Sequence, residues 1–153
     1  MKGLLAATVL VTMLAACATH NLSDDERLAL YRSHAGAPVK DFQYFGSLNG
    51  WSNLGDTALA VWTKPGTAYL LELAGPCNDL DYAPAISITN MMGQVSARFD
   101  SVIVLGGPRS IRIPCRINTI RPLDVKALKV SEQQLREAKI EERAEQQPAA
   151  DGR

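Results

Sequence analysis

Two neighbouring apolar stretches decide the fold class of this 153-residue chain: residues 57–63 (TALAVWT) and residues 68–73 (AYLLEL). Between them, Pro65 and Gly66 occupy the two central positions of a four-residue turn, where a type II turn prefers proline followed by glycine. The pattern therefore predicts a β-hairpin with one strand in each stretch.

Further short strands are expected on both sides of this hairpin. Turn residues separate the apolar residues before it, which predicts strands around Phe42, Tyr44 and Trp51. After it, strands are expected at residues 86–89, 102–105 and 110–120. We therefore predict an α+β fold, with a mainly antiparallel β-sheet of five to seven short strands over about residues 39–124. A short N-terminal helix and a solvated C-terminal helix complete it.

The stretch at residues 110–120 alternates between apolar and polar side chains. Its apolar positions are Ile111, Ile113, Cys115 and Ile117. The positions between them are Arg112, Pro114, Arg116 and Asn118. This alternation predicts a half-buried strand with Cys115 on the apolar face, and Pro114 indicates an edge position or a bulge.

The N-terminal helix is predicted from a capping box formed by Ser23 and Glu26. Leu28 and Tyr31 supply its apolar contacts, and His34 at its end can interact with the helix dipole. After residue 130 the chain becomes charged, and a second capping box at residues 131–134 predicts another helix start. Because its apolar stripe is thin, we expect residues 131–153 to form a solvated helix and a disordered tail. A single globular domain then spans residues 23–130.

The first seventeen residues resemble a bacterial lipoprotein signal. Lys2 precedes an apolar run at residues 4–14, which is too short to span a membrane. Residues 14–17 (LAAC) are similar to the lipobox, in which the cysteine receives diacylglycerol. We expect a signal peptide at residues 1–16, lipidation of Cys17 and a tether at residues 17–22, and Ala18 favours the outer membrane. The alternative is an ordinary signal peptide whose cysteine is incidental.

Charge and cysteine content restrict the classes of function that this chain can have. The 16 basic and 16 acidic side chains balance, which gives no electrostatic argument for a nucleic-acid partner. Apart from Cys17, the cysteines are Cys77 and Cys115, which we expect to form a disulfide in an oxidising periplasm. Their spacing is not that of a thioredoxin-like redox site or a zinc knuckle.

Few side chains suit catalysis or metal binding. The histidines are His20 and His34, so the sheet region lacks the histidine of a catalytic triad or a zinc site. Glu72 is expected to form a cross-strand salt bridge to an arginine, with a general acid as the alternative. Residues 78–81 (NDLD) are expected to form a turn and helix cap, with calcium ligation as the alternative. We predict no catalytic residue, no metal and no cofactor.

Four arginines form a basic run without an intervening acid: Arg109, Arg112, Arg116 and Arg121. Arg112 and Arg116 are an even number of residues apart, so on a strand they share one face. Such a face suits an anion such as a lipid phosphate, because guanidinium groups match phosphate oxygens. The alternative is a solvated outer face whose charges protect a sheet edge.

The order of several short motifs resembles a family of small proteobacterial lipoproteins that contain a domain of unknown function. The motifs lie at residues 51–54, 59–63, 68–73, 77–80 (CNDL), 99–102 (FDSV), 115–117 (CRI) and 120–124 (IRPLD). The resemblance covers about residues 42–124. It implies a secreted, lipidated, disulfide-closed domain and implies no activity.

These features together predict a non-enzymatic lipoprotein at the periplasmic face of the outer membrane. It would act by binding or structural contacts, with an envelope protein or an anionic lipid as its partner. The alternative is a periplasmic lipoprotein that binds a small ligand or anion through the strand from Arg109 to Arg121, and an enzyme that uses carboxylates is a third possibility.

Overall fold

The fold is built on a hairpin whose strands are buried on both faces. The structure is a computed structural model that describes residues 22–106 and 112–146. In it, β3 (Ala58–Lys64) pairs with β4 (Thr67–Leu73) in antiparallel register, with Leu59 opposite Leu71. The predicted hairpin is therefore confirmed.

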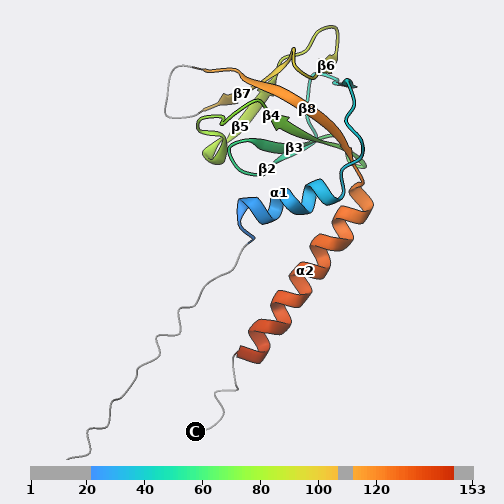
Figure 1. Cartoon of the computed structure of the whole chain (residues 1–153), viewed down its shortest axis with the longest axis vertical. Helices are drawn as coiled ribbons and strands as arrows, with labels where there is room; N and C mark the ends of the chain where they lie inside the picture. Colours follow the sequence, from blue (N-terminus) through green and yellow to red (C-terminus); the bar gives the residue numbers. More distant parts are fainter. Residues whose placement is uncertain (1–21, 107–111, 147–153) are drawn as a thin grey trace, which may run out of the picture.

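The described residues form an α+β fold, as predicted, with two sheets and two α-helices (Figure 1). The larger sheet is antiparallel and has the strand order β2-β3-β4-β8-β7-β5. Its remaining strands are β2 (Gly50–Asn53), β5 (Ala85–Ile88), β7 (Ser101–Leu105) and β8 (Cys115–Leu123). A second sheet pairs β1 (Asp41–Gln43) with β6 (Gln94–Ser96), and a short 3-10 helix, η1 (Leu80–Tyr82), precedes β5.

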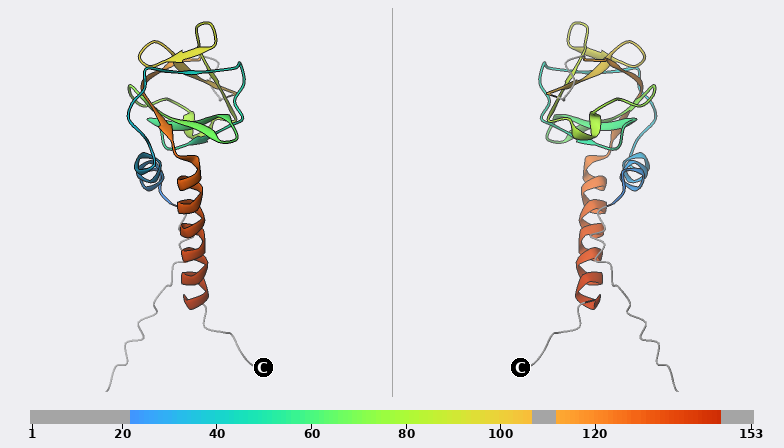
Figure 2. Two further views of the ribbon diagram at one scale, coloured as in Figure 1. Left: turned by 90° about the vertical axis from the view of Figure 1, so that its right-hand side faces the viewer. Right: turned by 90° about the vertical axis from the view of Figure 1, so that its left-hand side faces the viewer.

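Alternate residues of the large sheet enter two different cores. Leu59, Val61 and Leu71 join a core with Phe42 of β1 and Val95 of β6. The residues between them on β3 and β4 face α1 (Asp24–Ser33) and α2 (Val125–Gln146): Ala58, Ala60, Ala68 and Leu70. The alanines on this face allow the two helices to pack close to the sheet, and both helices lie on the same side of it (Figure 2).

The start of α1 is as predicted. Ser23 accepts a hydrogen bond from the backbone N–H of Glu26, and the Glu26 carboxylate accepts one from the backbone N–H of Ser23 at 2.8 Å. Leu28 and Tyr31 are buried on its inner face. His34 occupies the C-cap, and its Nε2 lies 2.9 Å from Ser131 Oγ on α2.

The predicted start of the C-terminal helix at Ser131 is wrong. α2 begins at Val125, because the Asp124 carboxylate accepts a hydrogen bond from the backbone N–H of Ala127 at 3.0 Å. Val125 and Leu128 are buried against the sheet, so tertiary packing supports the first turns of the helix. The predicted domain boundary at residues 130/131 thus falls inside a helix, and residues 147–153 lie outside the described part.

The predicted strand at residues 110–120 is also displaced. β8 begins at Cys115 and continues to Leu123, whereas Arg112, Ile113 and Pro114 belong to no strand and Ile113 is exposed. Pro114 has no N–H to donate to a neighbouring strand, and β7 contacts β8 at Val102 opposite Cys115 and Ser101 opposite Arg116. β8 is a central strand, so the edge position that Pro114 suggested is not found. Residues 107–111 lie outside the described part.

The disulfide between Cys77 and Cys115 is confirmed, with a distance of 5.5 Å between the two Cα atoms. It links the segment after β4 to the first residue of β8. Cys77 is buried in the core that contains Phe42 and Val95. The closed loop contains η1, β5, β6 and β7. Among the described residues, no helix is long and apolar enough to cross a membrane.

Candidate functional site

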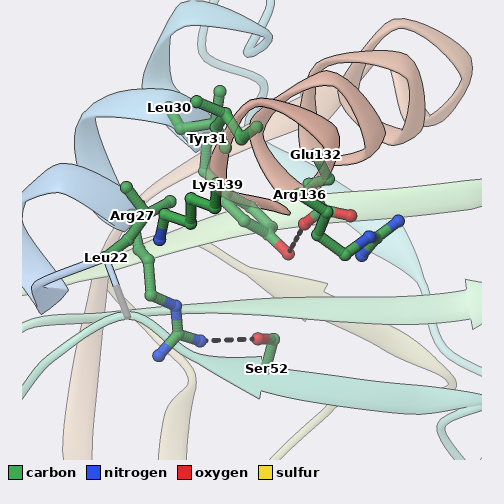
Figure 3. Close-up of a pocket in the computed structure, with 9 residues that line it drawn as sticks. Leu22, Arg27, Leu30, Tyr31, Ser52, Glu132, Arg136 and Lys139 are labelled. Atoms are coloured by element: carbon green, nitrogen blue, oxygen red, sulfur yellow. Dashed lines mark hydrogen bonds between the residues drawn. The ribbon is translucent and has the colours of Figure 1, made fainter. Parts of the chain in front are cut away.

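A groove of about 380 Å³ lies where α1, α2 and β2 meet (Figure 3). α1 and Leu22, two residues before it, contribute one wall, α2 contributes the other, and β2 contributes Ser52. The lining residues are Leu22, Arg27, Leu30, Tyr31, Ser52, Glu132, Leu135, Arg136 and Lys139.

Tyr31 and Glu132 join the two helices at the inner end of the groove. The Tyr31 hydroxyl donates a hydrogen bond of 3.0 Å to the Glu132 carboxylate, across 101 positions of sequence. Burial, followed by the nearby Glu132 charge, raises the pKa of Tyr31 to about 12. The hydroxyl therefore remains a donor to Glu132 at alkaline pH values at which an ordinary tyrosine, with a pKa of 10.0, ionises.

Arg27 connects α1 to the edge strand β2. Its Nη2 donates to the Asn53 carbonyl oxygen at 2.6 Å and to the Ser52 hydroxyl at 3.2 Å, and its Nη1 lies 3.5 Å from the Asp24 carboxylate. β2 thus holds this guanidinium in one position. The Arg27 side chain remains about one third exposed at the groove.

The lining combines a basic rim with an apolar surface. Arg27, Arg136 and Lys139 carry positive charge, and Asp24 offsets part of the Arg27 charge from 3.5 Å away. Among the lining residues, Glu132 is the one carboxylate, and it accepts the Tyr31 hydroxyl. Three half-buried leucines also line the groove: Leu22 before α1, Leu30 of α1 and Leu135 of α2. An anion with an attached apolar group matches this combination of side chains.

The structure does not assemble the predicted arginine strip. Arg112 precedes β8, so it does not share a strand face with Arg116, and Arg109 lies outside the described residues. Arg116 is exposed, and its Nη1 is 3.4 Å from the Arg98 carbonyl oxygen. The charge of Arg121 is offset by Glu72, whose carboxylate lies 3.6 Å from its Nε. Anion binding by these four arginines stays a prediction. The strand face that Arg112 and Arg116 were expected to share is not formed.

The predicted salt bridge of Glu72 to an arginine is confirmed. In addition to Arg121 on the neighbouring strand, Glu72 binds Arg32 of α1 at 2.7 Å. Residues 78–81 form the predicted turn, with Asp79 in a left-handed conformation before η1. The Asp81 carboxylate accepts a hydrogen bond from Asn53 at 2.8 Å. Within the described ranges, no group of three His, Cys, Asp or Glu side chains is placed to hold a metal ion.

The groove was not apparent from the sequence. Arg27, Ser52 and Glu132 come from three distant parts of the chain, and no local spacing relates them. The one local indication is that Leu30 and Arg27 lie three residues apart on a helix, so both point to one side of it. A prediction of helix–helix packing would have been needed to place Glu132 and Arg136 opposite them.

Comparisons with known proteins place the chain in a family. No curated protein and no solved structure gives a significant match. A family model described as a family of unknown function, DUF6491, matches residues 1–139, which include both cores, the disulfide and all groove residues. The match confirms the predicted resemblance to a domain of unknown function. The chain belongs to the family of unknown function DUF6491.

Proposed function

We propose that this protein is a non-enzymatic lipoprotein of a proteobacterial envelope, anchored through Cys17 at the periplasmic face of the outer membrane. In this proposal the domain acts by binding or by structural contacts with envelope components. The observation that carries it is the sequence LAAC at residues 14–17, at the end of a short apolar run. The signal peptide, Cys17 and the tether up to residue 21 lie outside the described residues.

The position of the first described residues supports an anchored domain. Leu22 lines the groove, and the capping box of α1 begins at Ser23. Four residues lie between Cys17 and Leu22, so the chain takes five steps of ~3.3 Å and reaches less than ~20 Å. In this proposal the groove therefore lies within ~20 Å of the lipid anchor.

The use of the inner carboxylates supports a non-enzymatic role. Glu72 pairs with two arginines, Glu132 accepts the Tyr31 hydroxyl, and Asp100 accepts from the Thr89 hydroxyl at 2.8 Å and the Ser96 backbone N–H at 2.7 Å. Each of these acids thus has a structural partner. This arrangement favours binding over acid–base chemistry.

Metabolic labelling tests the anchor. Cells that express the full chain are grown with a palmitate analogue, and the envelope fraction is examined for labelled protein and for its N-terminal residue by mass spectrometry. We expect label on Cys17 as the first residue, and loss of label in Cys17→Ser. The control, Cys77→Ala with Cys115→Ala, should keep the label. Label that persists in Cys17→Ser, or an unmodified N-terminus at another residue, would overturn the proposal.

The alternative function, binding of a small ligand or anion, is favoured by one observation. The groove brings cationic and apolar side chains together at a place different from the strand of Arg109 to Arg121.

A further inference from the structure

We infer that the groove between α1 and α2 binds the anionic head group of a phospholipid in the membrane that carries the Cys17 anchor. This inference rests on the proposed function, because the anchor brings the groove near a membrane. Binding would orient the domain with α1 and α2 toward the lipid surface.

The charges of the groove match a phosphate-containing head group. Arg136 is exposed on the α2 wall, and Lys139 lies one turn farther along the same helix, with its ammonium on the Arg27 side of the groove (Figure 3). On the opposite wall, Arg27 donates to β2 and lies 3.5 Å from the Asp24 carboxylate, so the test below alters the two cations of α2. Guanidinium groups bind phosphate oxygens through paired N–H donors.

The apolar part of the lining matches the remainder of a lipid better than it matches a free anion. Leu30 of α1 and Leu135 of α2 line the groove, and so does Leu22, which precedes α1. All three are half-buried, so part of each remains available to a glycerol backbone or the first carbons of an acyl chain. A site for inorganic phosphate would have no use for these side chains.

Tethering makes modest intrinsic affinity sufficient. A site held within ~20 Å of the bilayer meets its head groups at high effective concentration, because the second contact is intramolecular. Each basic side chain near an anionic surface contributes about a fivefold change in binding. Removal of two groove cations should therefore weaken binding about 25-fold.

The test uses the chain from residue 18 onward, which keeps the domain because both cores lie between Leu28 and Leu128. Its binding to phosphatidylcholine vesicles, with and without phosphatidylglycerol, is measured by co-sedimentation at low and high salt. The variant Arg136→Gln with Lys139→Gln is compared with a control of equal charge change, Lys40→Gln with Lys64→Gln, whose exposed side chains do not line the groove. Both altered groove residues follow Leu128, the last buried residue of α2, so the fold should persist; melting temperatures check this.

We expect wild type and the lysine control to bind the anionic vesicles at low salt within about twofold of each other, and the groove variant to bind at least tenfold more weakly. Equal loss in both variants, equal binding to neutral vesicles or no binding by wild type would overturn the inference. Full competition by soluble glycerol phosphate would identify a free phosphate ester as the ligand and overturn the membrane assignment. Because this chain lacks Cys17, failure here leaves the labelling test of the anchor unaffected.

Discussion

Tyr31 connects three elements through one side chain. Tyr31 is 5% exposed, and its hydroxyl donates to Glu132 of α2. Its ring packs edge to face on Trp62 of β3, with 6.5 Å between the ring centroids. A buried hydroxyl is costly without a partner, so the bond to Glu132 allows an apolar ring with a polar end to occupy this position. Tyr31 thereby fixes how α1 and α2 lie against the sheet.

Tyr31→Phe tests this bond by its pH dependence. Tyr31 ionises at about pH 12 in the folded protein against 10.0 for the ordinary side chain, so its contribution to stability is complete below pH 10 and is lost as the pH rises through 12. We expect the variant to be less stable by about 1 kcal/mol at neutral pH. The measurement is the melting temperature of both proteins between neutral pH and pH 12. The two curves should converge at high pH, and curves that stay parallel would contradict the role of the hydroxyl.

At the scale of the element, α2 has two parts with different environments. Its first turns are buried against the sheet through Val125 and Leu128, whereas Ile140 is 65% exposed farther along. The far part of the helix extends beyond the sheet into solvent (Figure 1). The predicted solvated character therefore holds for the later turns, and the first turns belong to the core.

Two alanine substitutions on α2 distinguish these parts. Leu128→Ala removes a side chain that is 1% exposed and should lower the free energy of unfolding by about 2–5 kcal/mol. Ile140→Ala should change it by less than about 0.5 kcal/mol, because little apolar surface is buried there. Urea unfolding followed by tryptophan fluorescence measures both. Similar values for the two variants would show that the helix docks along its whole length.

At the scale of the whole molecule, the disulfide closes a segment that supplies three strands. The segment from Cys77 to Cys115 spans 39 residues and supplies β5, β6 and β7. β7 pairs with β8 through only two residue pairs, so the sheet alone holds this segment weakly at β8. The disulfide between Cys77 and Cys115 restricts the unfolded chain over the same segment.

Cys77→Ala with Cys115→Ala should therefore lower the free energy of unfolding by about 2–4 kcal/mol, the range typical of such a loop. Denaturant midpoints of the oxidised protein, the reduced protein and the variant give the comparison. The reduced protein and the variant should agree with each other and lie below the oxidised protein. An unchanged midpoint after reduction would show that the bond adds nothing to stability.

The sequence by itself determined the features that depend on neighbouring residues. The β3–β4 hairpin follows from Pro65 and Gly66 between two apolar stretches, and the start of α1 follows from the capping box of Ser23. The partner of Cys77 could be predicted because Cys115 was the remaining cysteine of the domain. In each case the responsible residues are close in sequence or few in number.

Only the tertiary structure decided where β8 and α2 begin and which side chains meet in the groove. Local patterns favoured Ser131 as a helix start, yet burial of Leu128 and capping by Asp124 extend the helix toward the sheet. Glu132 meets Tyr31 because both helices pack on the alanine-rich face of β3 and β4. The Asp124 cap is local, but the contact between Tyr31 and Glu132 spans 101 positions, and local sequence patterns carry no information about such contacts.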